Sequence, residues 1–221
     1  MKETRRFYCS AESITSGLLH LWGALLSIGG TVLLILLSVR KEAAPIQLVS
    51  FCIYGASLIL LFSASTIFHI FYISPKVHRI LRKIDHSMVF CLIAGSYTPI
   101  CLLCLDGLIG WISLILIWSL ALVGIIGKIF WFKDSKGFSA IIYVIMGWGI
   151  VFLIKPLAQN LPFAAIVWLF IGGVLYTVGA VVYASKKCQF HFPTFGNHEL
   201  FHLFVLAGAA CHYYMIFQYV L

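Results

Sequence analysis

The chain of 221 residues is dominated by uninterrupted apolar runs. A helix needs about twenty consecutive apolar residues to cross the hydrocarbon core of a bilayer, and these runs reach that length. Hydrophobic residues make up 62% of the sequence and charged residues only 10%, which is too little charge to cover a soluble domain of this size. The sequence therefore predicts an all-α, polytopic membrane protein.

Seven apolar runs predict one bundle of transmembrane helices without a soluble domain. Short polar, Gly- or Pro-containing breaks separate the runs, and the basic segment SPKVHRILRKIDH is one of these predicted breaks. The second run is long enough to tilt or to extend beyond the bilayer. We expect a single seven-transmembrane domain over residues 1–221, with spans at about 17–39, 46–73, 87–105, 109–131, 138–157, 161–184 and 199–220.

The basic residues are distributed unevenly between the two sides of the predicted bundle. With the breaks assigned alternately to the two sides, twelve of the fifteen Lys and Arg residues share the side of the N-terminal tail. Cytoplasmic loops are the ones enriched in Lys and Arg, so we expect a cytoplasmic N-terminus and an outside C-terminus. We interpret the net charge of +8 as a topology signal and expect no nucleic-acid partner. The three basic residues on the opposite side are Arg40, Lys41 and Lys155. The twelve on the side of the N-terminal tail are Lys2, Arg5, Arg6, Lys76, Arg79, Arg82, Lys83, Lys128, Lys133, Lys136, Lys186 and Lys187.

With this topology, three separate spans bring polar side chains to one depth. Ionisable groups inside a membrane are costly, so each is a candidate for a functional role. The side chains are Ser65 and His69 near the cytoplasmic end of the second span, Asp85 and His86 at the start of the third, and His198 and His202 at the start of the seventh. A membrane histidine on its own is more often a hydrogen-bonded packing residue, but this convergence favours a metal site.

His198 and His202 are four residues apart, so both imidazoles face the same way on a helix. Zinc accepts nitrogen ligands, and catalytic zinc sites use three protein ligands and one water, so we expect His69 as the third ligand of a Zn²⁺ ion. Asp85 is expected either to bind the ion or to hold the water and accept its proton. Ser65, one turn before His69, is expected to orient that ring or to hydrogen-bond substrate.

Three further histidines have alternative interpretations. His86 is either a polar residue at the membrane interface or an additional ligand, and His20 lies at the right depth for an accessory group. His212, near the outer half of the last span, is expected to be a packing residue.

The string His198-Glu199-Leu200-Phe201-His202 also matches the His-Glu-x-x-His pattern of zinc peptidases. Intramembrane peptidases take a third ligand from a Leu-Asp-Gly-like stretch, and this chain contains Asp106 in such a stretch, Leu105-Asp106-Gly107. However, Asp106 is expected at the outer end of the third span, roughly 30 Å from the two histidines. We therefore expect Glu199 to bond a loop backbone or a neighbour instead of acting as a peptidase base.

A resemblance to a known family rests on three ordered segments, SASTIFH (63–69), KIDHSMVFCLIAGSYTPI (83–100) and NHELFHLFVLAGAACHYY (197–214). They resemble the hemolysin III proteins, the bacterial branch of the progestin and adipoQ receptor family. The segment AESITSGLLHLWGALLSIGG (11–30) is similar to the opening segment of that family, except that Ser16 and Leu21 replace the usual Asn and Gly.

The resemblance implies a seven-helix bundle with a cytoplasmic N-terminus in the inner (plasma) membrane of a bacterium. It also implies a buried zinc ion held by three histidines, which match His69, His198 and His202 here. The serine and aspartate that lie near the ion in the family match Ser65 and Asp85.

The resemblance leaves three functions open, because a shared fold does not select among them. Related members are receptors or suspected lipid-amide hydrolases, similar in layout to alkaline ceramidases, and hemolysin III is named for a lytic, pore-forming activity. We favour a zinc-dependent hydrolase of lipid amides or esters, with Asp85 as general base and then general acid and membrane lipids as partners. The alternatives are a pore-forming cytolysin and a receptor or membrane protein whose zinc is structural. The oligomeric state stays open.

Overall fold

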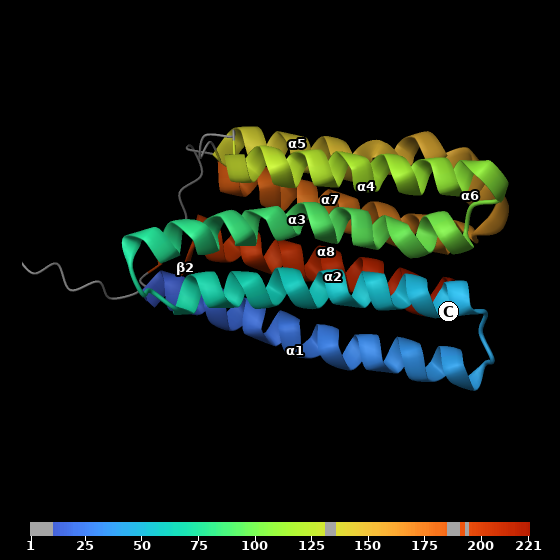
Figure 1. Cartoon of the computed structure of the whole chain (residues 1–221), viewed down its shortest axis with the longest axis horizontal. Coiled ribbons are helices and arrows are strands. Elements are labelled where there is room, and N and C mark those ends of the chain that lie inside the picture. Colours follow the sequence, from blue (N-terminus) through green and yellow to red (C-terminus); the bar gives the residue numbers. More distant parts are fainter. Residues whose placement is uncertain (1–10, 131–135, 185–190, 193–194) are drawn as a thin grey trace, which may run out of the picture.

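The computed structural model describes residues 11–130, 136–184, 191–192 and 195–221, most of which form long helices that lie side by side (Figure 1). Seven helices in this part of the chain are long and apolar enough to cross a membrane, which confirms the predicted fold class. The elements are α1 (Ala11–Arg40), α2 (Pro45–Ile70), α3 (Pro75–Leu103), α4 (Gly107–Phe130), α5 (Lys136–Trp148), the 3-10 helix η1 (Gly149–Leu153), α6 (Ile154–Asn160), α7 (Phe163–Ala184), β1 (His191–Phe192), β2 (Phe195–Gly196) and α8 (Asn197–Tyr219).

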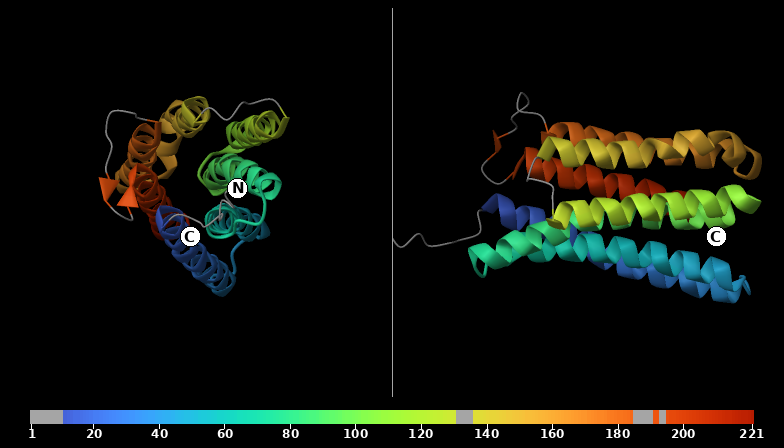
Figure 2. Two further views of the ribbon diagram at one scale, coloured as in Figure 1. Left: turned by 90° about the vertical axis from the view of Figure 1, so that its left-hand side faces the viewer. Right: turned by 45° about the horizontal axis from the view of Figure 1, so that its top comes forward.

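The helices are arranged around a centre when the bundle is viewed along its length (Figure 2). Helices α1 to α4 pack in chain order, α5 packs mainly on α7, α7 packs on α8, and α8 closes onto α1. The short strands β1 and β2 pair antiparallel just before α8. We call the end where α2 ends and α3 and α8 begin the near end, and the opposite end the far end.

The outer surface of the bundle carries large apolar side chains, such as Leu26, Leu108 and Phe163, which are 70%, 77% and 80% exposed. Such a surface is stable only when lipid or another apolar phase covers it. The chain is therefore a multi-pass integral membrane protein.

Helix α3 begins at Pro75, whereas the sequence predicted a loop there and the start of the span near residue 87. The Ser74 hydroxyl caps this helix by accepting a hydrogen bond from the backbone N–H of Val77 at 3.2 Å, and Pro75 occupies the first turn, where it is tolerated. The helix therefore continues beyond its apolar part, which places Asp85 within a continuous helix and not at its first turn.

The fifth span is also different from the prediction, because it is not one regular helix. It consists of α5, η1 and α6, and the change to 3-10 geometry begins at Gly149. The Tyr97 hydroxyl donates to the carbonyls of Met146 (3.0 Å) and Gly147 (2.9 Å), and the Trp148 indole N–H donates to Thr177 Oγ1 (2.8 Å). Irregular backbone at membrane depth requires such partners, and they join α5 to α3 and α7.

Some residues used in the topology argument lie outside the described residues, namely Lys2, Arg5, Arg6, Lys133, Lys186 and Lys187. Lys128, which was counted with the basic breaks, is buried in the last part of α4 with an exposure of only 1%. Its ammonium group lies 3.3 Å from the Ser139 hydroxyl of α5.

Candidate metal centre

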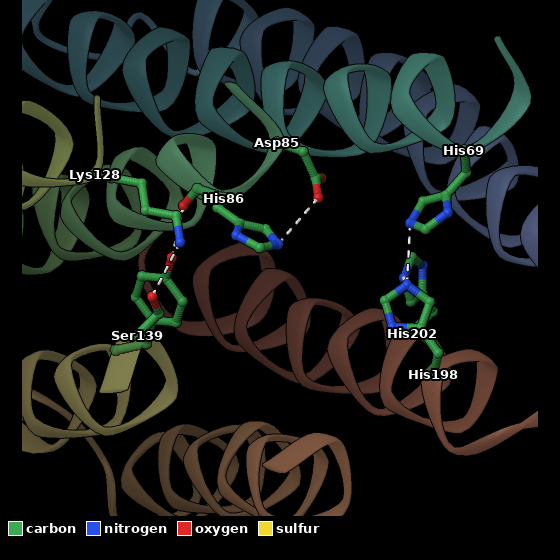
Figure 3. Close-up of polar contacts among 8 residues, drawn as sticks. His69, Asp85, His86, Lys128, Ser139, His198 and His202 are labelled. Atoms are coloured by element: carbon green, nitrogen blue, oxygen red, sulfur yellow. Dashed lines mark hydrogen bonds and ion pairs between the residues drawn. The ribbon is translucent and has the colours of Figure 1, made fainter. Parts of the chain in front are cut away.

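Three imidazoles meet at the near end of the bundle (Figure 3). His69 lies in the last turn of α2, and His198 and His202 lie in the first two turns of α8. His198 Nε2 is 3.1 Å from His69 Nε2 and 3.1 Å from His202 Nε2. One ligand atom of each ring falls within 4.8 Å of those of the other two. The predicted convergence of these three side chains is therefore present in the fold.

This arrangement fits a shared cation better than it fits hydrogen bonds among the rings. An imidazole nitrogen carries either one N–H or one lone pair, so His198 Nε2 cannot be well paired with both of its neighbours at once. A tetrahedral metal with Zn–N bonds of 2.0–2.1 Å would separate ligand nitrogens by about 3.3–3.4 Å. The two observed separations of 3.1 Å lie close to that value, and the ligand atoms of all three rings lie within 4.8 Å of one another. The group could therefore bind a metal ion through three neutral nitrogens.

Glu199 holds the first turn of α8 in place, as expected for a residue that bonds a loop backbone and a neighbour. Its carboxylate accepts a hydrogen bond from the Gly196 backbone N–H at 2.8 Å and another from the Ser16 hydroxyl of α1 at 2.6 Å. The side chain is 1% exposed. Both carboxylate oxygens are thus occupied in capping α8 and joining it to α1, an arrangement that does not suit a peptidase base.

Asp106 lies at the far end of the bundle, between the last residue of α3 and the first turn of α4. It is exposed, and it accepts a hydrogen bond from the Asn160 side chain at 2.8 Å. The rise of 1.5 Å per residue from Asp85 to Leu103 along α3 amounts to about 27 Å. The fold therefore separates Asp106 from the histidine group, as the sequence predicted.

Asp85 lines the same cavity as His198 and His202, and in the close-up view it lies between the histidine group and His86 (Figure 3). The distance from His86 Nε2 to Asp85 Oδ2 is 4.0 Å. Ser65, which is 1% exposed on α2, directs its hydroxyl toward the Asp85 carboxyl group. Ser65 is thus a neighbour of Asp85, whereas the sequence favoured a contact with His69 or with substrate. The catalytic roles of Asp85 and Ser65 stay predictions.

One cavity of about 170 Å³ connects these groups. Its near end is polar, because it is lined by His20, Ser65, Asp85, His86, His198 and His202. It continues toward the far end between α3, α5, α7 and α8, where the lining is mainly aliphatic and aromatic. From His198 to His212 along α8 the rise is about 21 Å. The candidate metal centre therefore lies at the polar end of a long apolar cavity.

Sequence reasoning missed two polar contacts close to this centre. One is the bond from Ser16 to Glu199, which joins residues 183 positions apart. The other is the bond from the Tyr143 hydroxyl to the His86 carbonyl at 2.8 Å, which fixes α3 against α5 next to Asp85. The sequence contains one signal for the first contact. Ser16 lies one helical turn before His20 and therefore on the same face of α1, the face that was expected near the site. No sequence signal identifies Tyr143.

Comparison with known proteins places the fold in a family. A family model described as "Haemolysin-III related" matches residues 7–213. "Hemolysin-3" of Bacillus cereus is 40% identical over 220 residues, which cover 100% of this chain and 97% of that protein. The "Hemolysin-3 homolog" of Bacillus subtilis (strain 168) is 40% identical over 208 residues, 94% of each chain.

A human protein is similar at lower identity. "Monocyte to macrophage differentiation factor" of Homo sapiens is 30% identical over 175 residues, which cover 76% of this chain and 69% of that protein. The matches with the family model and with both Bacillus proteins extend over the helices that carry the three imidazoles. The chain belongs to the haemolysin-III family, as the resemblance of its motifs indicated.

Proposed function

We propose that this protein is a zinc-dependent hydrolase that cleaves an amide or ester bond of a membrane lipid. The observation that carries the proposal is a group of three convergent imidazoles, two of which, His198 and His202, line the polar end of one apolar cavity together with the Asp85 carboxylate. Metal hydrolases commonly combine three protein ligands, one open coordination position and a nearby proton acceptor. The chain supplies the residues for each of these parts.

Zinc is the ion that suits this donor set best. The three ligand atoms are neutral imidazole nitrogens, and carboxylate oxygens, which magnesium and calcium prefer, do not belong to the convergent group in the described residues. When bound, the ion would act as a Lewis acid on a carbonyl group and would activate a water molecule as a nucleophile. His69, His198 and His202 would hold it.

Asp85 would move the proton in the proposed reaction. Its carboxylate would accept a proton from the attacking water and then deliver it to the leaving nitrogen or oxygen of the lipid. Ser65 and His86 are both neighbours of this carboxylate and would fix its direction. The products would be a free fatty acid and the amine or alcohol of the lipid headgroup.

The form of the cavity supports a lipid substrate. The polar end would hold the scissile bond, and the apolar part between α3, α5, α7 and α8 would hold an acyl chain. The distribution of basic residues predicts that the near end faces the cytoplasm, so the substrate would come from the inner leaflet. Since the Bacillus relatives are bacterial, we propose the bacterial plasma membrane as its location.

The direct test compares purified wild-type protein with Asp85→Asn. Both proteins are loaded with zinc in detergent micelles and incubated with N-acyl and O-acyl lipids, and released fatty acid is measured by mass spectrometry. We expect the variant to keep its zinc and to lose at least about a hundredfold in rate, because general acid–base groups contribute about that much. Equal release by both proteins would contradict the proposal.

The name of the Bacillus relatives supports lysis as a second candidate function. A lytic pore needs a water-lined path, so purified protein in liposomes would release an enclosed dye without added substrate. Release that rises with the protein-to-lipid ratio would favour a pore.

A third interpretation is that the metal is structural, since it would join α2 to α8. It predicts a lower melting temperature after chelation and no turnover of any lipid.

A further inference from the structure

A fourth imidazole, His20 of α1, lies against the candidate metal centre. Its ring centroid is 3.8 Å from that of His202, with an angle of 34° between the two ring planes. The edge of Phe62 covers another side of the ring at 5.1 Å. His20 is 3% exposed and lines the same cavity as His198 and His202.

Neither ring nitrogen of His20 has a hydrogen-bond partner among the described residues. The backbone of His202 lies nearby but does not reach hydrogen-bonding geometry with it. Buried polar atoms are nearly always paired, and leaving one unpaired is unfavourable. An imidazole with two unpaired nitrogens on a cavity wall therefore fits a partner that enters the cavity.

The packing of α1 brings His20 to this position. One turn before it, the Ser16 hydroxyl donates to Glu199 and joins α1 to the start of α8. Gly23, one turn after it, allows α1 to approach closely, because a Cβ atom there would lie 2.6 Å from Leu206 Cδ2 and 2.8 Å from Phe62 Cδ1. The contacts one turn before and one turn after His20 thus hold its ring at the wall of the cavity.

His20 is not part of the group that could share one ion. The ligand atoms that converge are those of His69, His198 and His202. A ligand also directs a nitrogen at the ion in its own ring plane, whereas His20 lies against the face of the His202 ring. Its nitrogens are therefore available to a molecule held at the three imidazoles.

We propose that His20 is a substrate-binding residue whose ring N–H donates a hydrogen bond to the carbonyl oxygen of the lipid at the candidate metal centre. This inference rests on the metal site of the proposed function but does not require turnover. A donor in this position would stabilise negative charge on that oxygen as the carbonyl is attacked. From the sequence, His20 was expected only as an accessory group, and its position in the fold specifies that role.

The test measures binding to protein loaded with Co²⁺, whose visible absorption reports ligand exchange. The probe is decanohydroxamic acid, which presents a carbonyl oxygen on an acyl chain. His20→Phe keeps a ring of similar shape and removes the N–H, whereas His20→Asn keeps an N–H donor. The matched control is His212→Phe, since His212 lines the same cavity but has its Nε2 3.1 Å from the Leu169 carbonyl oxygen.

We expect His20→Phe to bind one Co²⁺ like the wild type and to bind the hydroxamate roughly ten- to hundredfold more weakly, which corresponds to one strong hydrogen bond. The hydroxamate affinity of His20→Asn should lie closer to that of the wild type. The affinity of His212→Phe should stay within about twofold of the wild-type value, since the His212 ring bonds the Leu169 carbonyl and not the hydroxamate. If the Phe variant does not fold, His20→Leu with His20→Asn gives the same comparison.

Two outcomes would overturn the inference. Wild-type affinity for the hydroxamate in His20→Phe would reduce His20 to a packing residue, even if the protein hydrolyses lipids. Loss of Co²⁺ from folded His20→Phe would instead make the ring part of the metal site itself. If no lipid is hydrolysed but hydroxamate affinity depends on His20, the inference holds and the proposed hydrolase activity fails.

Discussion

Two of the cavity-lining histidines of helix α8, His202 and His212, have different surroundings, and the contrast separates a packing residue from a residue of the candidate site. The Nε2 atom of His212 lies 3.1 Å from the Leu169 carbonyl oxygen, and its ring contacts Tyr176 at a centroid distance of 5.4 Å. His202 has its Nε2 3.1 Å from another imidazole nitrogen, and its Nδ1 has no partner among the described residues. His212 thus has a hydrogen-bond partner within the protein, whereas His202 belongs to the group of imidazoles that could bind a metal ion.

The same contrast holds for the two ends of the cavity. At the far end, polar side chains such as Tyr97 and Trp148 donate to groups of neighbouring helices. At the near end, His20 and His202 keep buried nitrogens without such partners in the part of the chain that the structure describes. A buried polar residue is therefore informative mainly when the protein leaves it unpaired, because unpaired groups are unfavourable for stability and are retained where a ligand binds.

The largest effect is expected when this contrast is tested by removing each histidine. His202→Ala removes one of the three proposed ligands, so we expect the variant to bind a small fraction of the zinc that the wild type binds, with a zinc Kd at least about a hundredfold higher. His212→Ala should keep its zinc. Elemental analysis of the two purified variants beside the wild type gives the answer.

If both variants bind zinc equally, the three imidazoles are not the site. If both lose it, the loss comes from changed packing of α8 and not from a missing ligand. His69→Ala on α2 provides an independent check, because it removes a ligand without altering α8.

Much of the candidate centre could be predicted from the sequence, because it depends on local spacing and on topology. The spacing of His198 and His202 places both on one helix face, and the alternation of spans brings His69 to their depth. The start of α3 could not be predicted from hydropathy, since residues 75–86 are mostly polar or basic. Hydropathy detects the part of a helix that lies in lipid, whereas a capped helix continues into the polar region.

Contacts between distant residues could not be predicted from the sequence. The bond from Ser16 to Glu199 depends on the packing of the first helix against the last. The Glu-x-x-His part of the motif favours a peptidase when it is read locally, and only the fold shows that the carboxylate caps α8. The break after α5 likewise has a distant partner, the hydroxyl of Tyr97, which is 49 residues away from Met146.

A smaller effect, on stability, is expected at Glu199. Glu199→Ala leaves the buried Ser16 hydroxyl and the Gly196 N–H without their acceptor, so we expect the free energy of unfolding to fall by about 2–3 kcal/mol. Thermal unfolding in detergent micelles measures the change, and Asp85→Asn is the matched carboxylate control. A rate loss in Glu199→Ala as large as that of Asp85→Asn, with stability unchanged, would restore the peptidase interpretation.

The smallest effect is expected at the far end, where the hydroxyl of Tyr97 supports the break in the fifth span. The carbonyls of Met146 and Gly147 accept hydrogen bonds from this hydroxyl in the last turn of α5, directly before the change to 3-10 geometry at Gly149. Tyr97→Phe keeps the ring and removes their donor, so we expect a loss of about 1 kcal/mol in the free energy of unfolding. Zinc content should not change, because the near end is untouched.

Tyr213→Phe is the matched control for this change. The Tyr213 hydroxyl also donates to a carbonyl, that of Gly30 at 2.8 Å, but Gly30 lies within the continuous helix α1. That carbonyl keeps its position in the regular helical pattern, so we expect a loss of only about 0.5 kcal/mol. Equal losses in the two variants would mean that the break in the fifth span does not depend on Tyr97.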